Sequence, residues 1–246
     1  MINLIKLKKI ISPFLIFFFV FLLVFGVPSF VSLSPLYFHH VKNTGASEAL
    51  ADAGDLYLNV HDFLLLKDNL DSNFTSGEAS HMVDVRILFN VFRFGSLFFL
   101  SLILFYFVLV FKTNNFKFNS LRKFNSRKFS KKELSDFKNL CLDLFVFFKK
   151  LKIASIIALG LFLFLLFVIL IDFGSVFNVF HVVFFPQGNW IFPMDSLLIT
   201  LFPASFFMSF AKNIFIISFA VSSLILFFSY YFSGYLKKRN RFILQQ

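Results

Sequence analysis

The sequence predicts an all-α polytopic membrane protein with four transmembrane helices and a small, mostly helical extracytoplasmic cap. Of its 246 residues, 58% are hydrophobic and 15% are charged, whereas a soluble domain averages about 45–50% apolar and about 25% charged residues. The mean hydropathy is +0.80, and four apolar stretches approach the roughly 20 residues that cross a bilayer. These figures exclude a soluble globule, a disordered chain and a collagen-like fibre.

The first apolar stretch, residues 10–27, follows the basic residues Lys6, Lys8 and Lys9. A signal peptide has the same order, but its apolar region usually holds only about 7–15 residues. Residues 28–32 (PSFVS) also make a poor cleavage site. We therefore expect residues 1–32 to form a cytoplasmic N-terminus and a retained first transmembrane helix.

The connection at residues 33–88 is predicted to form the cap. Between residues 49 and 64, apolar side chains recur at alternating steps of three and four, which is typical of an amphipathic helix. After a polar turn at 71–73, residues 78–86 run towards the second apolar stretch, and we place transmembrane helix 2 at 89–111. Backbone groups in lipid must pair within their own segment, so the spans are helices.

The middle connection, residues 112–152, holds 12 basic and 3 acidic residues. Ser130 and Glu133 have capping-box spacing, and apolar residues recur at helical spacing from Leu134 to Leu151. An interfacial amphipathic helix on the anionic inner leaflet is the favoured interpretation, with a regulatory or partner-binding helix as the alternative. Cys141 lies on this apolar stripe and is interpreted as a small buried side chain. As the single cysteine, it excludes an intramolecular disulfide.

The rest of the chain is divided into transmembrane helix 3 at 153–171, a second outer connection at 172–212, and transmembrane helix 4 with a basic tail at 213–246. In the second connection, residues 186–189 predict a turn. A short helix is expected to begin at Asp195 as its N-cap and to end at Pro203. Trp190 fits an interfacial aromatic belt.

The distribution of charge predicts the orientation. Basic residues dominate the N-terminus, the middle connection and the C-terminal tail, whereas residues 33–88 hold three basic and eight acidic residues. By the positive-inside rule, both termini and the middle connection are cytoplasmic. The formal charge of +11 is therefore a topology signal, and no nucleic-acid motif accompanies it.

All five histidines fall on the predicted outer connections: His39, His40, His61, His81 and His181. No charged residue lies in the middle of a span, which counts against a pump or a coupled transporter. Glu78 and Asp84 each lie three residues from His81, on one helical face, and a carboxylate can fix the tautomer of an imidazole. From spacing alone, a solvated charged cluster is the favoured alternative. The apolar surroundings of His181 would be costly without a polar partner.

A metal site built from His39, His40, His61 and nearby acids is a further hypothesis. Adjacent histidines are more often ordinary surface residues, and the H-E-x-x-H arrangement of zinc peptidases is absent from the sequence. We expect a site that uses neither a metal nor a cofactor.

Two motifs resemble the bacterial lipoprotein intramolecular transacylase (Lit) family. The first is E-x-S-H-M-x-D-V-R at residues 78–86. The second is F-H-x-x-F-F-P-x-G-x-W-x-F at 180–192, followed by D-S-x-L-x-x-L-F-P at 195–203. Four spans with both termini inside also fit, although the basic middle connection is longer than the family leads us to expect. The resemblance implies a bacterial cytoplasmic membrane protein whose active site lies on the extracytoplasmic side.

The resemblance also implies the reaction. The sn-2 acyl chain of a diacylglyceryl-modified lipoprotein moves to the α-amine of its N-terminal cysteine, giving a lyso-form N-acyl lipoprotein. The functional histidines of the family correspond to His81 and His181. One imidazole would act as general base, and the other would stabilise the oxyanion, protonate the leaving oxygen or act as a nucleophile. The sequence leaves these roles open.

Six supporting residues follow from the same motifs: Glu78, Asp84, Arg86, Asn189, Trp190 and Asp195. The first two are candidates to orient His81, and the last three to shape or hydrogen-bond the pocket. The expected partners are diacylglyceryl lipoproteins and membrane lipid, without nucleic acid. The alternative function is a non-enzymatic membrane chaperone or sensor for envelope proteins.

Overall fold

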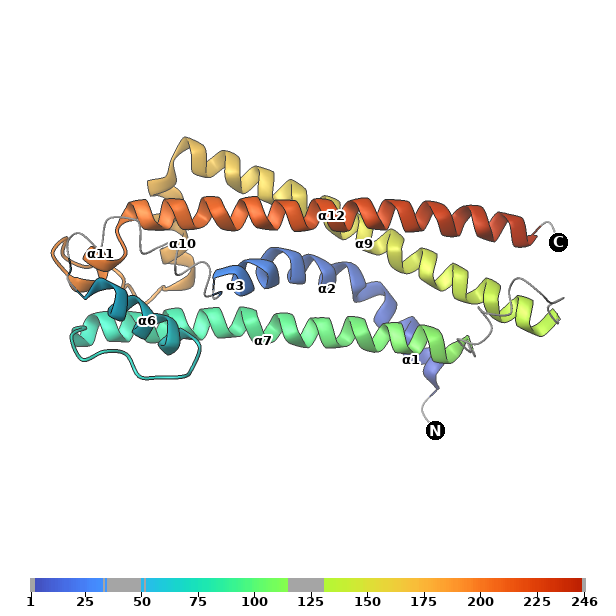
Figure 1. Cartoon of the computed structure of the whole chain (residues 1–246), viewed down its shortest axis with the longest axis horizontal. Helices are drawn as coiled ribbons and strands as arrows, with labels where there is room; N and C mark the ends of the chain where they lie inside the picture. Colours follow the sequence, from blue (N-terminus) through green and yellow to red (C-terminus); the bar gives the residue numbers. More distant parts are fainter. Residues whose placement is uncertain (1–2, 33, 35–49, 51, 115–130, 245–246) are drawn as a thin grey trace. The chain divides into compact units, whose positions relative to one another are not determined.

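The computed structural model describes residues 3–32, 34, 50, 52–114 and 131–244, and these residues form helices and connecting segments without a β-strand (Figure 1). Four of the described helical segments are long and apolar enough to cross a membrane: Leu4–Ser32, Ser76–Thr113, Lys131–Ile171 and Ala204–Arg239. The predicted all-α fold with four transmembrane helices is therefore confirmed.

The helices, in chain order, are α1 (Leu4–Ile11), the 3₁₀ helix η1 (Ser12–Phe14), α2 (Leu15–Phe21), the π-helix η2 (Leu22–Gly26), α3 (Val27–Ser32), α6 (Ala53–Leu64), α7 (Ser76–Thr113), α9 (Lys131–Ile171), α10 (Phe173–Phe184), α11 (Leu197–Leu201) and α12 (Ala204–Leu244). The chain divides into two compact units. The first unit comprises Met1–Leu23, Phe98–Leu159 and Ala220–Gln246, and the second comprises Val24–Leu97 and Gly160–Phe219. All four long helical segments contribute to both units.

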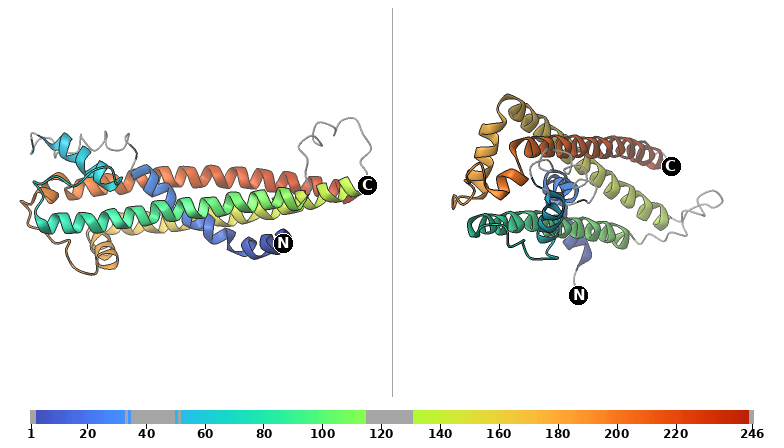
Figure 2. Two further views of the ribbon diagram at one scale, coloured as in Figure 1. Left: turned by 90° about the horizontal axis from the view of Figure 1, so that it is seen from below. Right: turned by 60° about the vertical axis from the view of Figure 1, so that its left-hand side comes forward.

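The first span is longer and less regular than the predicted stretch. It begins at Asn3, whose side-chain oxygen accepts the backbone N–H groups of Ile5 and Lys6. Pro13 then lies in a 3₁₀ turn, because proline cannot donate the backbone hydrogen bond that a regular α-helix needs. Figure 2 shows that α1 and α2 run in different directions around this break, as expected where a proline interrupts the ladder.

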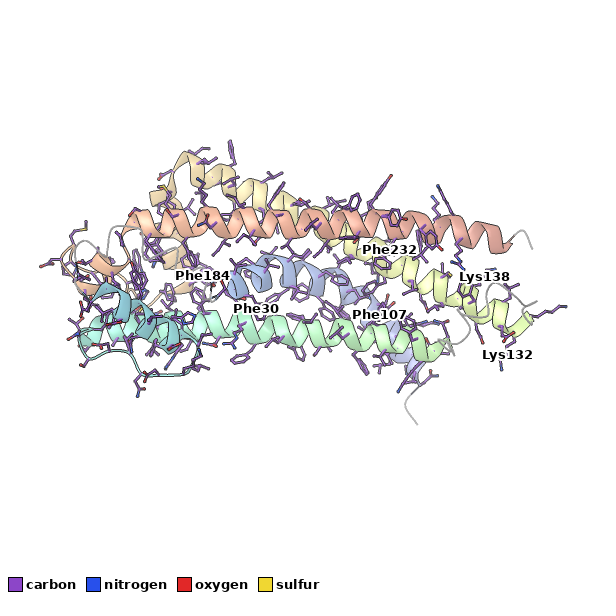
Figure 3. The ribbon with its side chains drawn as sticks, in the orientation of Figure 1. Phe30, Phe107, Lys132, Lys138, Phe184 and Phe232 are labelled. Carbon is purple, nitrogen blue, oxygen red and sulfur yellow. The ribbon has the colours of Figure 1, made fainter. Side chains whose placement is uncertain are left out.

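The amphipathic segment of the middle connection does not form a separate interfacial helix, so that prediction is wrong. Residues 131–171 form one continuous helix, α9, and residues 131–153 contain neither glycine nor proline to end it. Its first turns carry Lys132 and Lys138 (Figure 3). The apolar stripe packs into the core of the first unit through Leu140 and Phe147. The stripe thus has a protein partner, and Cys141 is buried beside it, as predicted.

The core of the second unit joins α6 to the first turns of α7 and α12 and to α11. Val60, Met82, Leu201 and Phe206 are buried together there, and α6 lies along the start of α7 in Figure 1. The Tyr57 hydroxyl adds a hydrogen bond to the Leu201 carbonyl. The expected helix of the first outer connection is therefore present, and it is fixed by packing.

Three further boundaries differ from the predicted ones. The second span was expected to begin at residue 89 and the fourth at residue 213, but α7 begins at Ser76 and α12 at Ala204. Both helices continue beyond their uniformly apolar part because their outer turns pack into the protein core. The short helix α11 has Ser196 as its N-cap, with its hydroxyl accepting the Ile199 N–H. Asp195 does not have this role.

Candidate active site

A capping box fixes the start of α7, the helix that carries His81. One Glu78 carboxylate oxygen accepts the backbone N–H and the hydroxyl of Thr75, both at 2.8 Å, and the Glu78 N–H donates to that hydroxyl at 3.3 Å. The other carboxylate oxygen accepts the Leu198 N–H of α11 at 2.8 Å. Glu78 is only 1% exposed. Its negative charge therefore ties together the N-terminal ends of two helices, where such a charge is favourable.

This use of Glu78 corrects the expectation that it orients His81. Within the described residues, no hydrogen bond joins the Glu78 carboxylate to the His81 ring. Glu78 positions His81 only indirectly, because it fixes the helical turn from which His81 projects.

The His81 ring is buried among aromatic side chains. It is 6% exposed, and its centroid lies 4.8 Å from that of Phe185 and 5.8 Å from that of Phe192. Its Nδ1 atom is buried and has no hydrogen-bond partner among the described residues. Buried polar atoms without a partner are uncommon and mark candidate functional groups.

His181 lies on α10, and the side chain of the N-cap residue Asp172 accepts the Ser175 N–H at the start of this helix. The His181 Nδ1 atom lies 2.7 Å from the Phe177 carbonyl oxygen, one helical turn earlier. A carbonyl can only accept, so Nδ1 carries the proton and Nε2 carries the lone pair. Burial lowers the pKa of His181 below its ordinary value of 6.5, while the Phe177 carbonyl opposes that shift. His181 is therefore a neutral imidazole at neutral pH, with Nε2 as its acceptor.

The two imidazoles, 100 positions apart in sequence, meet in the second unit. Their ring centroids lie 6.0 Å apart and their planes are inclined by 29°. Phe185 contacts both rings, with centroid distances of 4.8 and 5.6 Å. The Trp190 ring lies 4.9 Å from His181, so it packs on a catalytic candidate. At this spacing both imidazoles can contact one reacting carbonyl group.

Asp84, one turn beyond His81, holds the 186–190 turn against α7. Its Oδ2 atom accepts Gln187 Nε2 at 2.6 Å and Asn189 Nδ2 at 2.7 Å. Gly188 between them has a φ of 77°, a left-handed conformation that favours glycine. Asp84 makes no hydrogen bond to His81 within the described residues, yet its charge acts on the ring, as does the Asn189 side chain. Asp84 and Asn189 therefore lie beside His81, although Asp84 does not make the orienting hydrogen bond that the spacing suggested.

Two other predicted residues lie away from the histidines. The Arg86 guanidinium stacks over the Phe63 ring of α6 at 4.1 Å, a cation–π contact that packs α7 against α6. Asp195 is exposed. Neither contacts an imidazole in the described structure, so they do not supply the pocket groups that the motif suggested.

The described residues contain no group of three or more metal-ligating side chains. His61 is buried on α6, with its Nδ1 atom 3.2 Å from an Asp62 oxygen. His39 and His40 lie outside the described residues. Of the three histidines in the metal hypothesis, only His61 lies within the described residues, and it is not part of a metal-ligating group there.

Sequence reasoning missed the residues that surround the pair. Phe177 could have been found from its position four residues before His181, where a helical carbonyl meets the ring. Phe185 and Phe192 are fixed positions of the second motif, but no contact with the histidines was predicted for them. Gln187 gave no signal beyond lying in a predicted turn.

Known proteins share this fold. The sequence model of the family described as "Lipoprotein intramolecular transacylase Lit" matches residues 12–207, which include both histidines. The solved structure of the membrane integral lipoprotein intramolecular transacylase Lit from Bacillus cereus is 17% identical, with a TM-score of 0.61 over 96% of this chain and 99% of that chain.

Two further structures of the Bacillus cereus Lit protein carry a single histidine substitution. Both are 16% identical, with TM-scores of 0.61 and 0.59, and they cover 96% and 98% of this chain and 96% of their own. At this identity the structures show a shared fold. No curated protein matches the chain. Because the family model spans most of the sequence, this chain belongs to the lipoprotein intramolecular transacylase (Lit) family and is a membrane acyltransferase.

Proposed function

We propose that this protein moves the sn-2 acyl chain of a diacylglyceryl-modified lipoprotein to the α-amine of its N-terminal cysteine, with His81 and His181 as the catalytic pair. The observation that carries the proposal is the meeting of two buried imidazoles, 6.0 Å apart, in a chain of the Lit family. The product is a lyso-form lipoprotein with an N-acyl cysteine.

The proposed reaction needs one proton to move between two atoms of the same substrate. The amine nitrogen attacks the ester carbonyl carbon, and the bond from this carbon to the glyceryl oxygen then breaks. The proton that the amine loses ends on the glyceryl oxygen. An α-amine has a pKa of about 7.7–8.0, so an imidazole is a suitable base. Nucleophile and ester are already in one molecule, so positioning supplies much of the rate.

The surroundings of the rings favour different roles. Burial and the neighbouring His181 disfavour the protonated form of His81, and the Asp84 charge opposes them. We assign the proton transfer to His81, because Asp84 lies one helical turn away and can stabilise the positive charge while the ring briefly holds the proton. We assign the orientation of the amine to His181, whose Nδ1 proton is engaged by the Phe177 carbonyl. Its Nε2 lone pair can then accept an N–H of the substrate amine and direct the nitrogen towards the ester.

We place this site on the extracytoplasmic side, with both termini in the cytoplasm. The basic N-terminus, middle connection and tail support this orientation, as does the acidic balance of residues 33–88. Three valines of α10, Val179, Val182 and Val183, are more than half exposed. An exposed apolar surface on the helix that carries His181 is compatible with acyl chains that reach the site from the membrane.

Lipopeptide analysis tests the proposal. Full-length protein in lipid nanodiscs is mixed with a synthetic diacylglyceryl lipopeptide, and mass spectrometry follows the N-acyl lyso product. We expect His81→Ala to reduce the rate by about 10³-fold, within the range of general acid–base catalysis. His61→Gln is the matched control, because this histidine lies on α6 and is given no role. Undiminished product in both His81→Ala and His181→Ala would overturn the assignment of the catalytic pair, whereas no product from the unsubstituted protein would support the non-enzymatic alternative.

A further inference from the structure

Two buried polar atoms of the active site have no hydrogen-bond partner among the described residues: His81 Nδ1 and Asn189 Oδ1. The imidazole Nδ1 can carry a proton and donate a hydrogen bond, and the amide Oδ1 is a hydrogen-bond acceptor. Asn189 lies beside the turn of α7 that carries His81, because its amide contacts Ser80 and Asp84 on either side of that histidine in sequence. Leaving both atoms unpaired in an apolar site would be unfavourable, and a single N–H···O contact between them satisfies both.

The orientation of the Asn189 amide is fixed by its neighbours. Its Nδ2 atom donates to Asp84 Oδ2 at 2.7 Å and to Ser80 Oγ at 3.3 Å. The Asp84 carboxylate only accepts, so the NH₂ end of the amide must face it. Gln187 donates to the same Asp84 oxygen at 2.6 Å, which holds the carboxylate in place. The carbonyl end of Asn189 is thereby directed away from Asp84.

We propose that Asn189 is a positioning residue whose Oδ1 accepts a hydrogen bond from His81 Nδ1–H. The lone pair on His81 Nε2 is then presented to the substrate. Asp84 and Gln187 fix the amide in the orientation that this contact requires. The inference rests on the proposed role of His81 in proton transfer.

Both histidines then have the same tautomer, set in different ways. His181 donates its Nδ1 proton to a backbone carbonyl within its own helix, whereas His81 donates to a side chain from the 186–190 turn. A neutral amide between Asp84 and His81 has a chemical advantage over direct ion pairing. A carboxylate in direct contact would hold the ring in its protonated form, whereas the amide lets the ring return its proton to the glyceryl oxygen.

A purely structural role for Asn189 makes a different prediction. In that case Asn189 would only hold the 186–190 turn on α7, and the tautomer of His81 would not depend on it. Two measurements distinguish the two roles. The first is the tautomer of His81. The second is the activity of a double variant that exchanges the Asp84 carboxylate and the Asn189 amide, which keeps these two side chains in contact.

The first experiment measures ring tautomers by ¹⁵N NMR of histidine-labelled full-length protein in nanodiscs, above pH 8, with His81→Asn and His181→Asn used to assign signals. We expect His81 to carry its proton on Nδ1 in the unsubstituted protein, and to shift towards the Nε2–H tautomer in Asn189→Leu. His181 is the internal control and should keep Nδ1–H in both. An Nε2–H tautomer of His81 in the unsubstituted protein would overturn the inference, even if Asn189→Leu does not fold.

The second experiment compares Asn189→Leu, Asp84→Asn and the exchange Asp84→Asn with Asn189→Asp in the lipopeptide assay. We expect the rate to fall about 10²-fold in Asn189→Leu and about 10-fold in Asp84→Asn, mainly in kcat. We expect recovery to within about threefold in the exchange on the plateau of its own pH–rate profile, where the new carboxylate still accepts the hydrogen bond from His81 Nδ1–H.

The exchange should also move the rising limb of the pH–rate profile to higher pH, because a carboxylate in contact with His81 favours its protonated form. The titratable groups that act on this ring are His181 and Asp84, so the profile is repeated in His181→Asn. An unshifted limb, or a fully active Asn189→Leu, would overturn the inference. If His81→Ala is also fully active, the proposed function fails instead.

Discussion

The two units of the chain differ in how they hold ionisable side chains. In the first unit, the Lys8 ammonium lies 2.6 Å from an Asp143 oxygen, and Asn114 donates to that same oxygen at 2.7 Å. Lys150 donates to the Ser12 hydroxyl at 2.8 Å and to the Ser12 carbonyl. In the second unit, His81 keeps a buried nitrogen without a hydrogen-bond partner. Paired charges fix helices in place, whereas a buried imidazole nitrogen without a partner marks a candidate functional group. In His81, the proposed contact between Nδ1 and Asn189 leaves Nε2 for the substrate.

The comparison also separates two kinds of carboxylate within the second unit. Glu78 is fully engaged by Thr75 and Leu198 at helix ends, and so resembles Asp143 of the first unit. Asp84 meets side chains of the 186–190 turn and acts on His81. We therefore expect Glu78 and Asp143 to contribute to stability, and Asp84 and the histidines to contribute to rate.

The largest of four expected effects distinguishes the histidine pair from the structural groups. His181→Asn keeps a donor for the Phe177 carbonyl, because the asparagine Nδ2 takes the place of the imidazole Nδ1, but it removes Nε2. We expect the rate on the lipopeptide to fall about 10²-fold, mainly in kcat, while the apparent melting temperature stays within about 2 °C. A change confined to KM would mean that His181 only binds the substrate.

Much of the fold could be predicted because lipid imposes a simple rule. An apolar stretch of sufficient length must be helical, so the four spans followed from composition. Their ends did not follow, because helices continue wherever an amphipathic turn finds a protein partner. Residues 131–152 illustrate this point: their stripe fits a lipid surface or a protein core equally well, and it packs on Tyr106 and Val110.

The site could be predicted only in part. His81 and His181 were identified through a resemblance, and no local pattern shows that two histidines 100 positions apart will meet. Glu78 was assigned to His81 on helical spacing, although Thr75-x-x-Glu78 is also capping-box spacing. Backbone N–H groups at a helix terminus need an acceptor whether or not a substrate is bound, and Glu78 supplies it.

The second effect tests whether Glu78 contributes to stability. Glu78→Ala removes three hydrogen-bond acceptor contacts from backbone and hydroxyl donors at two helix ends. We expect the free energy of unfolding to fall by about 3 kcal/mol, measured by denaturant titration in detergent micelles. Glu78→Gln is the matched control and should lose about half as much, since its amide oxygen still accepts. An unchanged stability in Glu78→Ala would remove the distinction between Glu78 and Asp84.

A third and smaller effect is expected in the first unit. The Lys8 and Asp143 side chains are 16% and 21% exposed, so Asp143→Ala leaves an ammonium mostly buried without its counter-ion. We expect a loss of about 1–2 kcal/mol in the free energy of unfolding and no change in the lipopeptide rate. The paired change Lys8→Met with Asp143→Leu should recover most of that loss. A rate change in the paired variant would show that the first unit also affects the chemistry.

The smallest effect is a pH dependence of stability that originates in the second unit. The pKa of folded His181 lies below 6.5 because of burial, so the unfolded chain binds a proton at a higher pH than the folded chain. Its contribution to stability is therefore present above about pH 6.5 and is lost as the pH falls towards the folded value. Carboxyl groups titrate near pH 4, which leaves the range from pH 7.5 to 5 for histidines.

We expect the melting temperature to fall less over this range in His181→Asn than in the unsubstituted protein. His81 is present in both proteins, so the difference between the slopes reports His181 together with its influence on the His81 ring. Equal slopes would mean that the His181 ring is solvated, which would also remove the reason to regard it as a neutral acceptor at neutral pH.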